Sequence, residues 1–147
     1  MSTFFNLKNK VAIITGSSRG IGRGIASRFS ELGAKVVISS RKIDSCNIVV
    51  NEILKKGGEA SSFECNISNK KSCEELVQFA KNQYGKLDIL VCNAASNPYY
   101  GNLADIPDES FEKIMNNNVK SNLWLSKAAI PLLKKNNKGN IIIVSSI

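Results

Sequence analysis

The chain of 147 residues contains no histidine, three prolines and one tryptophan, and no apolar run approaches the length of a membrane span. Without histidine, a Ser-His-Asp catalytic triad is excluded. The short apolar runs exclude a membrane-spanning helix, and we expect no leader because no basic-then-apolar segment precedes the first strand. With 43% hydrophobic and 22% charged residues, the sequence predicts one globular domain, residues 1–147, with a buried core.

Acidic residues are also few, 12 against 20 lysines and arginines, which gives a net charge of +8. A nucleic-acid-binding protein is one reading of this charge. The lysines, however, are scattered along the chain, and the pairs 55–56, 70–71 and 134–135 fall at helix ends or on polar faces. We therefore expect a solvated surface and no nucleic-acid partner, and any bound anion is expected to be a cofactor phosphate.

The four cysteines show no metal-ligand spacing, and no metal site is predicted. Cys65 and Cys92 end apolar segments, where a free thiol behaves as a small hydrophobic side chain. The sequence therefore predicts reduced cysteines in an intracellular protein.

A glycine-rich turn, residues 15–22, follows the apolar run 11–14 and opens a helical pattern. Gly16 suits a turn conformation that other residues avoid, and Gly20 and Gly22 permit close approach of the backbone. A buried strand, a glycine turn and a helix N-terminus together form an anion site, because free N–H groups and the helix dipole favour negative charge. This arrangement predicts a bound dinucleotide.

Five short apolar segments alternate with helical patterns along the whole chain. The segments are residues 11–14, 36–38, 61–64, 89–91 and 141–144. The helical patterns cover residues 19–32, 43–55, 73–84 and 108–135. Four of the five segments are continuously apolar, which is typical of parallel strands covered on both faces, whereas 61–64 indicates a strand near the sheet edge. The sequence predicts an α/β fold with a doubly wound parallel sheet, the Rossmann arrangement.

The end of the second strand distinguishes between two dinucleotides. NAD-binding sites carry a carboxylate there for the ribose hydroxyls, but this chain has Ser40 followed by Arg41. Arginine binds a phosphate through two parallel hydrogen bonds, and Arg19 in the glycine turn offers a second cation. The alternative is that both arginines are ordinary surface charges. We predict NADP(H) as the cofactor, with NAD less favoured.

Polar and small residues follow the other strands, at the edge where ligands bind in such sheets. Asn66, next to Ile67, is positioned to hydrogen-bond an adenine edge. Asn93 and Ala94 are expected to border a ribose, although Asn93 is equally suited to joining neighbouring strands. Ser146 closes the fifth strand, where its hydroxyl is predicted to bind a substrate carbonyl.

Asn118 is a polar residue on one face of the longest helical pattern. A buried amide must be hydrogen-bonded or it costs about 1–3 kcal/mol. Two readings stay open: neighbouring backbone satisfies the side chain, or Asn118 holds an ordered water beside a reaction centre. Tyr99 and Tyr100 line a substrate pocket, or they serve loop packing or a subunit contact, and the second reading is favoured.

Taken together, these motifs resemble the short-chain dehydrogenase/reductase family from Lys10 to the end of the chain. The segments that carry the resemblance are 15–22, 93–95, 118–119 and 139–146. Within the family, residues 37–42 and 93–101 are similar to a narrower group, the NADPH-dependent carbonyl and retinal reductases of the dehydrogenase/reductase member 4 type.

The resemblance implies a role for each matching position. It assigns the pyrophosphate and adenosine side to Gly16, Ser18, Arg19, Gly20, Ile21 and Gly22. It assigns the 2′-phosphate to Ser40 and Arg41, the adenine to Asn66 and Ile67, and the ribose to Asn93 and Ala94. Members often carry Asp where Asn66 stands. The catalytic positions implied are Asn118, as the anchor of a proton-relay water, and Ser146, which orients the substrate carbonyl.

In the family a tyrosine of a Tyr-x-x-x-Lys motif donates the proton, and none of Tyr84, Tyr99 and Tyr100 has a lysine four positions later. We therefore expect five strands of a seven-stranded fold, from a truncated chain that binds cofactor with little or no turnover. The alternative is a non-catalytic NADP-binding or interaction module. The last strand is expected to leave an apolar sheet edge that favours self-association.

The resemblance also implies the setting of the full-length enzyme. Its substrate is expected to be a small ketone, aldehyde or alcohol, and the full-length relative is expected to be a homo-oligomer. The expected location is cytoplasmic, or peroxisomal where a C-terminal signal is present.

Overall fold

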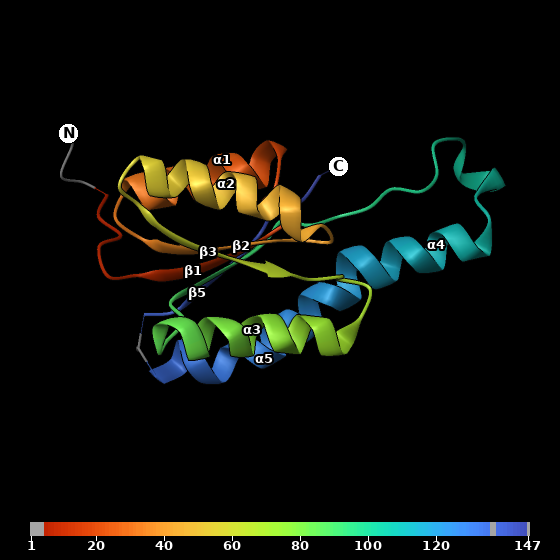
Figure 1. Cartoon of the computed structure of the whole chain (residues 1–147). Helices are drawn as coiled ribbons and strands as arrows, with labels where there is room; N and C mark the ends of the chain where they lie inside the picture. The colour runs from red at the N-terminus through yellow and green to blue at the C-terminus, as the bar shows by residue number, and fades with distance from the viewer. Residues whose placement is uncertain (1–4, 136–137, 147) are drawn as a thin grey trace.

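The computed structural model describes residues 5–135 and 138–146, which form a five-stranded sheet between two layers of helices (Figure 1). The strands are β1 (Val11–Thr15), β2 (Lys35–Ser40), β3 (Glu59–Glu64), β4 (Ile89–Cys92) and β5 (Asn140–Ile143). The α-helices are α1 (Gly20–Glu31), α2 (Ile43–Lys55), α3 (Lys70–Tyr84), α4 (Asp108–Met115) and α5 (Ser121–Lys135). A short 3-10 helix, η1, covers Leu103–Asp105, and a π-helical turn, η2, covers Asn116–Lys120.

The sheet is parallel throughout, in the order β3-β2-β1-β4-β5. The predicted α/β Rossmann arrangement is confirmed, and each of the five predicted segments is a strand. The segment 61–64 belongs to β3 at one sheet edge, as its weak apolar pattern indicates. Among the described residues, no helix has both the length and the apolar character needed to cross a membrane.

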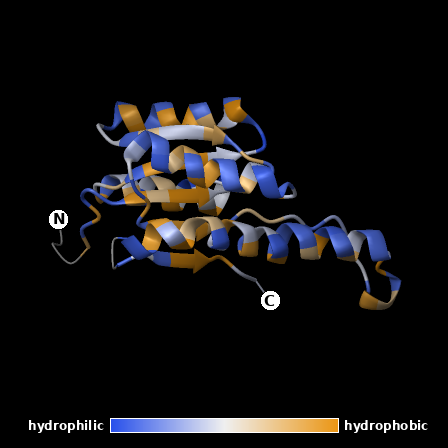
Figure 2. Ribbon diagram, turned by 90° about the horizontal axis from the view of Figure 1, so that it is seen from below, coloured by the Kyte–Doolittle hydropathy of each residue, from blue (hydrophilic) through white to orange (hydrophobic). Residues whose placement is uncertain are grey.

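Helices cover both faces of the sheet, α1 and α2 on one side and α3 and α5 on the other (Figure 1). Because side chains alternate along a strand, β1 supplies both cores: Ile14 packs in the cluster under α1 and α2, and Ile13 in the cluster under α3 and α5. Figure 2 shows hydrophobic residues along the central strands and helices in which hydrophobic and hydrophilic residues alternate. This double burial explains why the central strands read as continuous apolar runs.

The edge strand β5 is the exception. Its three isoleucines, Ile141, Ile142 and Ile143, are 37%, 43% and 55% exposed. The predicted apolar sheet edge is therefore present in the structure.

The pattern 108–135 predicts one helix, but the structure interrupts it. Five residues, Asn116–Lys120, form a π-helical turn between α4 and α5. The Ser121 hydroxyl donates to the Asn117 carbonyl at 2.6 Å, so a side chain takes part in the bonding of this turn. The loop after β4 and α4 extend beyond the sheet as an arm (Figure 1).

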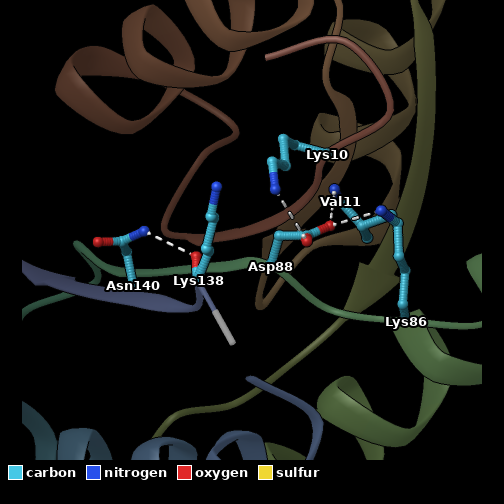
Figure 3. Close-up of polar contacts among 6 residues, drawn as sticks. All are labelled: Lys10, Val11, Lys86, Asp88, Lys138 and Asn140. Carbon is cyan, nitrogen blue, oxygen red and sulfur yellow. Dashed lines mark hydrogen bonds and ion pairs between the residues drawn. The ribbon is translucent and has the colours of Figure 1, made fainter. Parts of the chain in front are cut away.

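The buried residue Asp88, directly before β4, joins three strands at the amino-terminal edge of the sheet through its carboxylate and its backbone (Figure 3). Asp88 Oδ2 accepts from the Val11 N–H at 2.9 Å and lies 3.1 Å from Lys86 Nζ, while Oδ1 lies 3.5 Å from Lys10 Nζ. The Asp88 carbonyl accepts from the Asn140 N–H at 3.0 Å, which brings in β5. Burial raises the pKa of Asp88, but the Val11 N–H and the two lysines outweigh it and hold the pKa below its usual range.

Candidate functional site

The glycine turn connects β1 to α1 through backbone conformations that favour glycine. Gly16 and Gly20 have φ of +64° and +56°. A Cβ at Gly20 would meet nothing within 4 Å, so glycine is favoured there by the positive φ and not by lack of space. The space above the turn is open. Arg19 is the exposed N-cap of α1, Ser18 is half-buried, and Ile21 is 68% exposed. The turn therefore presents a free helix N-terminus, which favours an anion.

Ser17 fixes this turn to the neighbouring strand β2. Its buried hydroxyl donates to the Ile14 carbonyl at 2.6 Å and accepts from the Ser39 N–H at 2.9 Å. The Ser17 N–H donates to the Ser39 carbonyl at 3.0 Å. The sequence analysis missed Ser17. A small hydroxyl residue directly after the first glycine was the only available signal.

A second set of hydrogen bonds fixes the turn to the end of β4. Thr15 Oγ1 accepts from the N–H groups of Asn93 and Ala94, both at 3.0 Å. Asn93 Nδ2 donates to the carbonyls of Thr15 and Gly16 at 3.0 and 3.2 Å. Of the two readings of Asn93, the structure supports strand joining, while its position beside a ribose stays a prediction. The contacts that Gly22 permits are with Asn93 and Gly16 rather than with open space.

The end of β2 carries the residues predicted to distinguish the two dinucleotides. Ser40 Oγ is engaged by its own loop, through the N–H and carbonyl of Lys42 at 3.3 and 3.2 Å and the Cys46 thiol at 3.2 Å. Burial raises the pKa of Cys46, so this thiol stays protonated beneath Ser40. Arg41 is exposed, and Glu64 is paired with Ser40 in the register of β2 and β3. The strand end therefore offers a polar, uncharged residue with one cation and one carboxylate nearby.

The four arginines of the chain divide into two pairs. Arg23 and Arg28 each form an ion pair with a surface glutamate, at 2.7 and 2.9 Å. Within residues 5–135 and 138–146, Arg19 and Arg41 have no ion-pair partner, and both are exposed. The two unpaired guanidinium groups are those of the glycine turn and the end of β2.

The loop after β3 contains the residues predicted for the adenine. Asn66 Oδ1 accepts from the N–H and hydroxyl of Ser68 at 3.1 and 2.8 Å, and the Asn66 N–H donates to Ser72 Oγ at 3.1 Å. Asn66 is exposed, whereas Ile67 is buried in the core under α3. The Asn66 side chain thus shapes this loop, and its contact with an adenine stays a prediction.

Asn118 lies in the π-helical turn and holds the loop after β4. Its Oδ1 accepts from the Ser96 N–H at 2.8 Å, and its Nδ2 donates to the Ser96 carbonyl at 2.9 Å. The Asn118 carbonyl accepts from Asn122 Nδ2 at 2.9 Å. The reading in which neighbouring backbone satisfies the side chain is therefore the one that the structure supports. A water-holding role stays a prediction.

Ser96 also receives a third bond, from Asn117 Nδ2 to its hydroxyl at 2.8 Å. The Asn117 side chain is buried, and its Oδ1 has no hydrogen-bond partner in the described part of the chain. Sequence reasoning missed Ser96, because nothing marks a serine four residues past a strand as the receptor of two asparagine side chains.

Ser146 follows β5 near the end of β4. Val144 N–H donates to the Cys92 carbonyl at 3.0 Å, so the chain between β5 and Ser146 continues beside β4. Ser146 is exposed. Tyr99 donates its hydroxyl to the Asn102 carbonyl at 3.0 Å and Tyr100 is 87% exposed, so Tyr99 serves loop packing, as favoured.

The predicted residues meet at the carboxyl-terminal edge of the sheet. The chain runs from β1 outward to β3 and then returns to β4 on the other side, which places the change of direction between β1 and β4. Open parallel sheets bind ligands at this point, outside the carboxyl ends of the strands. The glycine turn, Asn93 and Ala94 lie directly there.

Comparison with known proteins identifies the family. The sequence model of the short chain dehydrogenases matches residues 10–147. This chain belongs to the short-chain dehydrogenase family. Dehydrogenase/reductase SDR family member 4 from Sus scrofa is 40% identical over 141 residues, which are 96% of this chain and 50% of that protein. The Oryctolagus cuniculus protein of the same name is 42% identical over 141 residues, 96% of this chain and 54% of that protein. The resemblance to the member 4 group is confirmed.

Solved structures of this family share the fold. A 7 alpha-hydroxysteroid dehydrogenase complexed with NADH and 7-oxo glycochenodeoxycholic acid has a TM-score of 0.91 at 38% identity, over 96% of this chain and 55% of that one. A metagenomic short-chain oxidoreductase in complex with NADP has a TM-score of 0.90 at 33% identity, over 96% of this chain and 64% of that one. This short-chain dehydrogenase sequence spans about half the length of the curated relatives it matches.

Proposed function

We propose that this chain is the cofactor-binding part of an NADP(H)-dependent oxidoreductase that interconverts carbonyl compounds and alcohols. The observation that carries the choice of NADP(H) is the pair of unpaired arginines, Arg19 and Arg41, which follow the adjacent strands β1 and β2. A 2′-phosphate there would supply the counter-charge that neither guanidinium has within the described residues.

The surroundings of these arginines support the same choice. Ser40 adds no charge, and Glu64, the carboxylate opposite it in the register, is outnumbered by the two guanidinium groups. An NAD-type site would place a carboxylate where Ser40 stands, to accept from the ribose hydroxyls. NAD(H) is the second candidate, because the relatives with solved structures include an NADH complex and an NADP complex.

The remaining residues fit a dinucleotide laid across the edge. The open space above Gly20 and the free N-terminus of α1 suit the pyrophosphate. Asn66 and Ile67 would border the adenine, and Asn93 and Ala94 the nicotinamide ribose. NADPH, when bound, supplies the hydride. Asn118 would hold a proton-relay water and Ser146 would orient the carbonyl of a small ketone or aldehyde.

Arg41→Gln tests the cofactor choice. A hydrogen bond to a charged group contributes about 1.5–3 kcal/mol, so we expect NADPH to bind about tenfold or more weakly, with NADH affinity nearly unchanged. Isothermal titration calorimetry measures both. Glu64→Gln should change NADPH affinity in the opposite direction, because it removes the neighbouring negative charge. Lys81→Gln, an exposed substitution on α3, is the matched control. Equal binding of NADPH and NADH by the wild type would contradict the proposal.

We also expect the 147 residues by themselves to show little or no turnover. None of their three tyrosines has a lysine four positions later, so the motif that supplies the proton in this family is absent from them. Loss of NADPH absorbance with a diketone or with retinal measures this directly. Turnover at an enzyme-like rate would show that another group of the chain donates the proton.

A further inference from the structure

Strand β5 has a neighbouring strand on one side only. It pairs with β4, and within residues 5–135 and 138–146 no strand lies beyond it. The N–H groups of Asn140 and Val144 donate to carbonyls on the β4 side, both at 3.0 Å. Because backbone groups alternate in direction along a strand, the N–H and carbonyl groups of Ile141 and Ile143 point away from β4. These groups form the open edge of the sheet.

The open edge at β5 is apolar and uncharged. Residues 139–147 contain no charged residue and no proline, the residues that usually protect a sheet edge. The three isoleucines of β5 are all exposed. Ile141 also lines a hollow of about 470 Å³ together with Ile130 and Leu133 of α5. Apolar strands of low charge pair with identical strands, so a second β5 fits this edge.

The opposite edge of the sheet, at β3, is protected. This strand begins and ends with Glu59 and Glu64, and Glu59 forms an ion pair with Lys35 at 3.0 Å. The hydroxyls of Ser61 and Ser62 are hydrogen-bonded to side chains of α3 and α2. Charged side chains on an edge strand disfavour pairing with another chain. Of the two edges, β5 is therefore the one suited to pairing, and an assembly through β5 alone ends at two copies.

We propose that two copies of this chain join their β5 strands antiparallel about a two-fold axis, which merges the two five-stranded sheets into one. With Ile142 opposite Ile142 of the second copy, every isoleucine of one strand faces an isoleucine of the other. Ile141 and Ile143 then form hydrogen-bonded pairs across the axis, because their N–H and carbonyl groups point outward. A shift of two residues would place Gly139 or Ser145 opposite an isoleucine, so the register centred on Ile142 buries the most apolar surface.

Charge and shape favour the antiparallel arrangement over a parallel one. In-register parallel pairing would place Lys138 beside Lys138 of the second copy, whereas the antiparallel register separates these charges to opposite ends of the paired strands. The antiparallel register also fills the hollow under α5. Ile143 of the second copy stands opposite Ile141 on the same face of the sheet, so its side chain lies at the hollow lined by Ile130 and Leu133.

Sedimentation equilibrium of the whole chain tests the interface, and we expect a dimer. In the Ile142→Lys variant two lysines would meet at the two-fold axis, so the dissociation constant should rise about tenfold or more. Ile48→Lys, at an isoleucine of α2 that is 60% exposed, is the matched control and should stay dimeric. A wild-type monomer, or species larger than a dimer, would overturn the proposal. So would dissociation by Leu123→Lys on α5 while Ile142→Lys stays dimeric, because helices would then form the interface.

Disulfide cross-linking tests the register. Ile142→Cys should give a linked dimer under mild oxidation, because facing residues of an antiparallel pair have Cα atoms about 4.5–5.5 Å apart. Ile141→Cys and Ile143→Cys should not link to their own copies, which lie two residues, about 7 Å, further along the strand, but a mixture of the two variants should link. The four native cysteines are buried, so the wild type should give no linked dimer. No link in Ile142→Cys, or self-linking of the other two variants, would contradict this register.

Discussion

Replacement of Asp88 by alanine is expected to lower the free energy of unfolding by about 3 kcal/mol. The carboxylate is only 2% exposed and accepts from the Val11 N–H, which is itself buried. Alanine leaves that N–H without its acceptor and removes the counter-charge of two lysines. The backbone of Asp88 also bonds to Val11 and Asn140, so the lost carboxylate lies where β4 meets β1 and β5.

Asp88→Asn is the matched control, because its amide oxygen can still accept from Val11 while the charge is lost. We expect the free energy of unfolding of this variant to fall by about 1 kcal/mol, less than that of the alanine variant. Urea denaturation followed by the fluorescence of Trp124, the single tryptophan, measures both variants. Equal stability of the alanine variant and the wild type would show that water replaces the carboxylate without cost.

The lowered pKa of Asp88 fixes the sign of the pH dependence. Its folded pKa lies below the ordinary value of 3.8, so near that value the unfolded chain binds more protons than the folded chain. The contribution of Asp88 is complete above the ordinary pKa and is lost as pH falls through the folded one. Asp88→Asn should therefore remove part of the loss of stability on acidification.

Much of this fold follows from local pattern in the sequence. Continuous apolar runs such as 11–14 and 89–91 arise because a central parallel strand is buried on both faces. The same reasoning placed β3 at the edge, where Glu59, Ser61 and other polar residues meet solvent. The π-helical turn 116–120 was not predicted, because its residues also fit an α-helix and it depends on bonds to Ser96, far along the chain.

The residues of the candidate site likewise fall into those that the sequence predicts and those that it does not. The glycine positions could be predicted because a positive φ, such as +64° at Gly16, strongly favours glycine, so the backbone conformation is reflected in the residue type. Thr15, Ser17 and Ser96 could not, since a hydroxyl that bonds distant backbone looks like any other serine or threonine. The position of Arg41 after the second strand predicts a phosphate ligand, but an ordinary surface charge fits the same sequence. The structure adds that Arg23 forms an ion pair with Glu52, whereas Arg41 has no ion pair among the described residues.

Gly22→Ala is expected to cost both stability and cofactor binding. A Cβ at this position would lie 2.5 Å from Asn93 Nδ2 and 2.5 Å from the Gly16 carbonyl oxygen. Neither atom can yield easily, because they are hydrogen-bonded to each other at 3.2 Å and Asn93 also holds Thr15. The methyl group must therefore displace the glycine turn itself. Overpacking of this kind costs about 2 kcal/mol. A turn displaced from its phosphate loses charge-assisted bonds, which corresponds to at least tenfold weaker NADPH binding.

Gly24→Ala provides the control on the same helix. A Cβ there would meet nothing within 4 Å, and Gly24 lies inside α1, so alanine should stabilise the chain by about 0.5–1 kcal/mol. NADPH affinity should stay unchanged. The two variants differ from the wild type by the same methyl group, two residues apart, so opposite effects in urea denaturation and in calorimetry isolate the contact with Asn93 and Gly16. If Gly22→Ala matched Gly24→Ala in both measurements, the tight packing between the glycine turn and the end of β4 would have no energetic weight. The dinucleotide site would then depend on the open side of the turn, at Gly20 and Arg19, alone.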